Sequence, residues 1–145
     1  MTPQQIRDAI AASPELTALA QAGATQDIAD ALSVGRTKIV THFASERGIL
    51  ERLPAGPLAG DTLIAKLEAF AVTAHPMARI VGRALRFLGH PEGLDIGSPA
   101  TRALLAQLQA GGVISADELA GLTAMATVAD PITHTQVGYA LTGGN

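Results

Sequence analysis

Apolar residues recur along most of the chain at intervals of three and four, which is the period of an amphipathic α-helix. The clearest run follows Asp61, and its apolar positions are Leu63, Ile64, Leu67, Phe70 and Ala71. No alternation of apolar and polar residues is long enough to predict a strand, and no segment repeats at a fixed period. The pattern therefore predicts an all-α protein.

Capping signals mark the starts of these helices. Thr2-Pro3-Gln4-Gln5 offers an N-cap hydroxyl, a proline at the first helical position and a glutamine at the third. Ser13-Pro14-Glu15 and Ser98-Pro99 repeat the combination of serine and proline, and Ser115-Ala116-Asp117-Glu118 is a second capping box. Each helix is thus expected to begin at a defined residue.

Together these patterns predict about eight short helices in one compact, orthogonal or bundle-like array. The chain has 145 residues, about the size of one ordinary domain, so we expect a single domain over residues 1–145. Within it, helices are expected in residues 2–53 and 61–142. The prolines and glycines of residues 54–60 predict a loop between these two groups.

Composition narrows the range of partners. The net charge of -3 gives no global attraction to nucleic acid or to an anionic membrane. The first residues are too polar for a signal peptide, and no run approaches the ~18 apolar residues of a membrane span. We expect a soluble protein without a membrane partner.

Residues that would carry catalysis or bind a metal are sparse. The chain lacks cysteine, and its four histidines are too far apart in sequence to share a helix face: His42, His75, His90 and His134. No serine lies on a Gly-x-Ser-x-Gly turn, and no complete phosphate-binding loop is present. We therefore predict a non-enzymatic protein with no catalytic residue, metal, cofactor or small-molecule substrate.

Three arginines form the most prominent charged feature. Arg79, Arg83 and Arg86 are spaced by four and three residues, so they project from one side of a predicted helix. No acidic residue occurs between Glu68 and Glu92 to neutralise them. They form either a docking face for a carboxylate-rich or phosphate-bearing partner, or the solvated side of an amphipathic helix. The inward side is expected to carry Ile80, Val81, Ala84, Leu85 and Leu88.

A second feature is the run of residues 27–45. It resembles, at Asp27, Ile28, Ala29, Ala31, Val34, Arg36, His42, Phe43 and Ser45, the helix-turn-helix of the TetR family of repressors. The resemblance implies two packed helices, of which the second runs through Ile39, Val40 and Phe43, and it implies binding in a DNA major groove.

In this alternative, Arg36, Thr37 and Lys38 would contact the DNA. The chain departs from the family at Ser33, where a glycine is usual, and at Val40, where a tyrosine is usual. The surrounding segment also carries as many acids as bases, which is unfavourable for a DNA-binding surface. We rank this interpretation second.

A broader resemblance covers most of the chain. The segments that carry it are residues 14–20 (PELTALA), 28–32 (IADAL), 35–38 (GRTK), 97–102 (GSPATR), 111–115 (GGVIS) and 129–132 (ADPI). The chain is similar in them to small, Ala- and Leu-rich proteins encoded in structural modules of tailed phages and prophages. This implies a bacteriophage virion structural or assembly protein of the neck, tail or an accessory position. It would be made in the bacterial host cytoplasm, reside in the virion and contact other phage structural proteins in a symmetric assembly.

Overall fold

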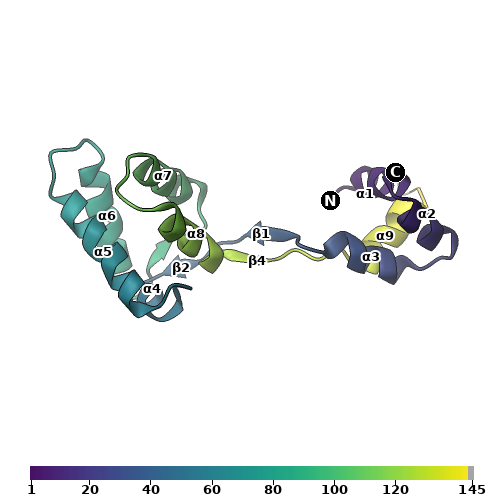
Figure 1. Ribbon diagram of the computed structural model, residues 1–145, viewed down its shortest axis with the longest axis horizontal. Helices are drawn as coiled ribbons and strands as arrows, with labels where there is room; N and C mark the ends of the chain where they lie inside the picture. The colour runs from purple at the N-terminus through teal and green to yellow at the C-terminus, as the bar shows by residue number, and fades with distance from the viewer. Residues whose placement is uncertain (144–145) are drawn as a thin grey trace. The chain divides into compact units, whose positions relative to one another are not determined.

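The computed structural model describes residues 1–143, and this part of the chain is mostly helical (Figure 1). Its elements in chain order are α1 (Pro3–Ala12), α2 (Pro14–Gln21), α3 (Thr25–Ser33), β1 (Thr37–Ile39), β2 (Phe43–Ala44), α4 (Glu46–Arg52), α5 (Pro57–Ala71), α6 (Ala78–Leu88), β3 (Leu94–Asp95), α7 (Pro99–Ala110), α8 (Ala116–Met125), β4 (Thr127–Ala129) and α9 (His134–Leu141). The prediction of a mainly helical chain is confirmed. The described residues form nine helices rather than about eight, and they add two small two-stranded sheets.

The fold consists of two compact units rather than the single array expected. Unit 1 contains Met1–Lys38 and the described residues from Ala129 on, and unit 2 contains Ile39–Val128. The expected loop at residues 54–60 lies within unit 2 and does not separate the two units. Helix α5 already begins at Pro57 and packs against α4. The chain passes between the units in β1 and again in β4, and these two strands pair with each other.

Unit 1 is built from α1, α2, α3 and α9. The buried residues of its core are Ile6, Ile10, Ile28, Ala29, Ile132, Val137 and Ala140. The predicted capping box at α1 is present, since Gln5 N donates to Thr2 Oγ1 at 3.2 Å and Thr2 N donates to Gln5 Oε1 at 2.8 Å. Helix α9 packs on both α1 and α3, so this core joins the beginning of the sequence to its last described helix.

The helix expected through Ile39, Val40 and Phe43 is not formed, and this prediction is wrong. Helix α3 ends at Ser33, and Gly35 follows with a φ of +70°, a conformation that glycine adopts readily. The chain then continues as β1 and β2. Ile39 and Val40 are β-branched, and β1 pairs with β4, whose Thr127 and Val128 are β-branched as well.

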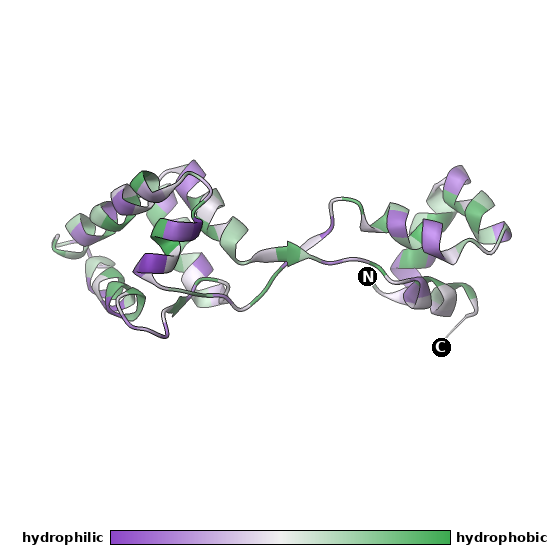
Figure 2. Cartoon of the chain, turned by 90° about the horizontal axis from the view of Figure 1, so that it is seen from below, coloured by the Kyte–Doolittle hydropathy of each residue, from purple (hydrophilic) through white to green (hydrophobic). Residues whose placement is uncertain are grey.

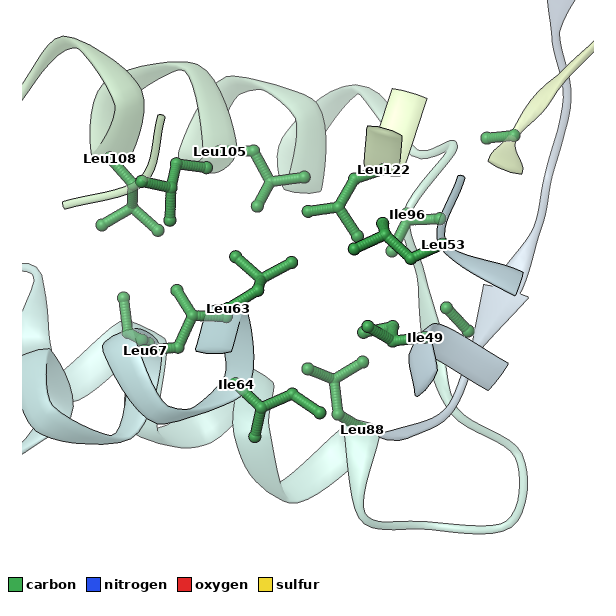
Figure 3. Close-up of a cluster of buried hydrophobic side chains, with 14 residues drawn as sticks. Ile49, Leu53, Leu63, Ile64, Leu67, Leu88, Ile96, Leu105, Leu108 and Leu122 are labelled. Carbon is green, nitrogen blue, oxygen red and sulfur yellow. The ribbon is translucent and has the colours of Figure 1, made fainter. Parts of the chain in front are cut away.

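Unit 2 encloses the larger core, drawn in Figure 3. Its fully buried members include Leu63 of α5, Ile49 of α4, Val81 of α6 and Leu108 of α7. Few aromatic residues take part, so close helix packing depends on small residues. Gly60 is an example, because a Cβ atom at this position would lie 3.1 Å from the carbonyl oxygen of Ile49.

Unit 2 also contains a short antiparallel sheet. Strand β2 pairs with β3, with Phe43 opposite Asp95 and Ala44 opposite Leu94. The Asp95 carboxylate fixes the following turn, since Oδ1 accepts hydrogen bonds from His42 N and Gly97 N, both at 3.0 Å. Gly97 itself is buried against the carbonyl of Val40.

The helices of both units carry hydrophilic residues beside hydrophobic ones (Figure 2). None of those in residues 1–143 is long and apolar enough to span a membrane. The generous hydrophobic content of the chain is thus distributed over short amphipathic helices.

Candidate functional site

The arginine stripe, defined as Arg79, Arg83 and Arg86, lies on the outer side of α6. All three side chains are exposed, while the opposite side of the helix buries Val81 and Leu88. Within the part of the chain that the structure describes, no hydrogen bond or ion pair joins any of the three guanidinium groups to another residue. The stripe is therefore a row of positive charge without a partner among the described residues.

The sequence placed Ile80 on the inward side of this helix, and that assignment is wrong. Ile80 is 54% exposed, and Phe87, two turns along, is 58% exposed. The hydrophobic periodicity did not distinguish the exposed Ile80 from the buried Val81, because the two residues are adjacent and Ile80 lies at the edge of the apolar side. The arginine stripe is consequently bordered by two large apolar side chains in contact with solvent.

A surface groove runs beside these two side chains. It has a volume of about 230 Å³, and the residues that line it are Ile80, Arg83, Ala84, Phe87, Leu94, Ala100, Thr101 and Leu104. The groove therefore combines an apolar floor from α6, α7 and β3 with a guanidinium group at its rim. Tight interfaces commonly place apolar anchor residues next to arginine in this way.

Contacts at both ends of helix α6 and along its buried side hold it in place. At its start, His75 Nδ1 accepts a hydrogen bond from Met77 N at 3.2 Å, and at its end Gly89 N donates to the carbonyl of Leu85 at 3.0 Å. Its buried side packs against α5. The stripe and the groove are thus presented by a helix anchored in the core of unit 2.

Arg36, Thr37 and Lys38, the residues of the DNA-binding alternative, lie in a different setting. Arg36 Nη2 is 2.7 Å from Asp130 Oδ2, and Lys38 Nζ is 3.3 Å from Asp130 Oδ1. The backbone supports the same contact, because Asp130 N donates to the Arg36 carbonyl at 3.1 Å. Both cations therefore form ion pairs with Asp130 inside unit 1.

The DNA-binding interpretation gains no support from this arrangement. It requires a recognition helix after Arg36, and the chain forms β1 there. It also requires cations free to approach phosphate, and Asp130 neutralises one unit of this charge. Asp130 is not predictable as the partner of Arg36 from a local pattern, because the two residues are 94 positions apart in the sequence.

The pKa of the Asp130 carboxyl is lowered by hydrogen bonds from Arg36 and Lys38. A lowered pKa means that the ionised carboxylate stabilises the folded state above the unfolded pKa, about 4, and that this stability is lost as the pH falls through the folded pKa. We expect Asp130→Asn to lower the melting temperature at neutral pH. The difference from the wild type should shrink below about pH 4.

Thermal unfolding followed by circular dichroism over a pH series measures this effect. Glu92→Gln is the matched control, because Glu92 is exposed and makes no ion pair among residues 1–143; it should leave the melting temperature unchanged at neutral pH. A wild-type advantage over Asp130→Asn that persists undiminished in acid would show that the ion pairs do not contribute as described.

No three histidine, aspartate or glutamate side chains of residues 1–143 are grouped so that they could hold a metal ion. The core of unit 2 contains an apolar cavity of about 30 Å³, lined by residues such as Leu63, Leu85 and Leu105. This volume corresponds to about one water molecule, which is too small for an organic substrate.

No protein-family model, curated protein or solved structure matches the chain. The candidate site therefore rests on its own geometry. The arginine stripe and its groove are the feature of the described surface in which unpaired charge, exposed apolar side chains and a concave shape coincide.

Proposed function

We propose that the chain is a non-enzymatic structural or assembly component of a tailed-phage particle. It is made in the bacterial cytoplasm and enters the virion by binding other structural proteins, in the neck, the tail or an accessory position. The observation that carries this proposal is the arginine stripe beside the exposed Ile80 and Phe87.

Such a surface gains free energy when a partner covers it. Exposed apolar side chains lose contact with water when a partner covers them, and each guanidinium group can form paired hydrogen bonds with a carboxylate. A single patch of this size gives modest affinity. In a symmetric particle the same contact is repeated around an axis, so weak individual contacts add to stable incorporation.

The resemblance to phage structural proteins supports the same proposal. Two of the segments that carry it, residues 35–38 and 129–132, are far apart in sequence and are joined by the ion pairs of Asp130 with Arg36 and Lys38. A third, residues 97–102, begins with Gly97, which is buried against Val40. The resemblance therefore involves positions on which the fold depends.

We expect the triple substitution Arg79→Glu, Arg83→Glu and Arg86→Glu to abolish incorporation into phage particles. The three side chains are exposed and unpaired among the described residues, so the fold should remain intact while the charge of the docking face is reversed. The measurement is the amount of the chain in purified particles, with the melting temperature as a check of folding.

Arg52→Glu with Arg102→Glu is the matched control. Both residues are exposed arginines of unit 2 that make no ion pair within residues 1–143, and neither lines the groove. This double variant should enter particles at the wild-type level. Normal incorporation of a folded triple variant would show that the arginine stripe is only a solvated helix side.

A further inference from the structure

A second charged face lies on α5, the helix that precedes α6. The residues exposed along one side of α5 and at its C-cap are Leu58, Asp61, Ala65, Glu68 and Val72, at alternating intervals of three and four. Leu58 is 80% exposed and Val72 is 86% exposed. We call this set the acidic face, and its two carboxylates make no ion pair with any described residue.

The charges of the acidic face and of the arginine stripe have the same spacing. Asp61 and Glu68 are seven residues apart, and so are Arg79 and Arg86. Seven residues of α-helix rise by about 10.5 Å, or two turns. If the two helices lie side by side and antiparallel, both carboxylates can therefore meet both guanidinium groups at once.

Within one chain, the acidic face and the arginine stripe form no ion pairs with each other among the described residues. Helices α5 and α6 pack together and lie side by side in Figure 1. Even so, no ion pair joins the two sets of charges in the described chain. Each unit 2 therefore presents both an unpaired acidic face and an unpaired basic one.

The apolar residues fit the same pairing. In the antiparallel register that matches Asp61 with Arg86 and Glu68 with Arg79, Leu58 falls within one helical turn of Phe87. Phe87 and Ile80 line the groove of about 230 Å³, which offers an apolar surface to an exposed leucine. Charge complementarity and apolar contact thus favour the same pairing of the acidic face with the arginine stripe.

We infer that the partner of the arginine stripe is a second copy of this chain, bound through its acidic face. This inference rests on the proposed function and names the partner of the same site. Because every copy carries both faces, the contact can be repeated from copy to copy, as a symmetric particle requires.

A charge-swap experiment on the full chain tests the inference. Sedimentation velocity over a concentration series should show self-association of the wild type. Arg79→Glu with Arg86→Glu should raise the dissociation constant at least about tenfold, and so should Asp61→Arg with Glu68→Arg. An equimolar mixture of these two double variants should associate again, as should the chain that carries all four substitutions.

The control is again Arg52→Glu with Arg102→Glu, which should associate like the wild type. A wild type that stays monomeric throughout the series overturns the inference, and so do charge-swapped pairs that fail to restore association. Recovery of association in the mixture supports it, because a misfolded variant could not be rescued by its opposite charge.

Particle incorporation separates failure of this inference from failure of the proposed function. If the chain is monomeric but the triple arginine variant is still excluded from particles, a different phage protein binds the stripe and the proposed function stands. If the charge swap behaves as described but the chain does not enter particles, self-association stands and the virion assignment fails.

Discussion

Replacement of Leu63 by alanine is expected to lower the free energy of unfolding of unit 2 by about 2–5 kcal/mol. Leu63 is completely buried in the centre of the larger core, and Figure 3 shows it between the side chains of α5 and those of α7 and α8. Its truncation removes apolar contacts and leaves a void that the surrounding helices fill only in part.

Urea denaturation followed by circular dichroism, together with hydrogen exchange of peptides from α5 to α8, measures this loss. Leu58→Ala is the matched control, because it makes the same substitution on the same helix at a side chain that is 80% exposed. At protein concentrations low enough to keep the chain monomeric, the control should change stability by less than about 0.5 kcal/mol. Equal effects of the two substitutions would contradict the assignment of buried and exposed sides of α5.

Replacement of Gly97 by alanine is expected to be as damaging, although it adds a single carbon atom. A Cβ atom at this position would overlap the carbonyl oxygen of Val40, and backbone atoms cannot yield as the end of a flexible side chain can. The backbone around β2 and β3 must therefore shift, which also disturbs the hydrogen bonds of Asp95 to His42 and Gly97. We expect a loss of about 3 kcal/mol or more.

Gly82→Ala provides the control for this substitution. Gly82 lies within α6, where the nearest atom to an added Cβ is the Cβ of Ala71 at an ordinary 3.7 Å. Alanine also favours the helix over glycine by up to about 1 kcal/mol. The melting temperature should fall clearly for Gly97→Ala and stay level or rise for Gly82→Ala. A tolerated Gly97→Ala would mean that the chain does not approach Gly97 as closely as described.

Local signals predicted the helices of this protein well. The capping boxes at Thr2 and Ser115 are formed as the sequence indicated, because a cap depends on residues only three positions apart. The start of α5 was misplaced to Asp61, since Pro57 and Gly56 were assigned to a loop although proline is favoured at the first helical position.

Non-local contacts account for what the sequence did not predict. The strands β1 and β4 pair across a long stretch of sequence, so Ile39 and Val40 were assigned to a helix on local pattern alone. The return of α9 to α1 and α3, and with it the division into two units, is equally invisible to a local analysis.

The candidate site was predictable only in part. The spacing of Arg79, Arg83 and Arg86 was sufficient to place them on one exposed side of a helix. The exposure of Ile80 and Phe87 depends on how α6 packs against α5 and β3, and the groove beside them also needs the lining residues of α7. Such packing is determined by the tertiary fold rather than by the periodicity of one helix.

The virion assignment is tested most directly by mass spectrometry of purified particles of a phage that encodes this chain. The proposed function predicts that the chain is present in a fixed ratio to the major structural proteins and remains after the particles are washed and sedimented. Its absence from intact particles, with the chain left in the soluble fraction of the lysate, would contradict the assignment as a virion component.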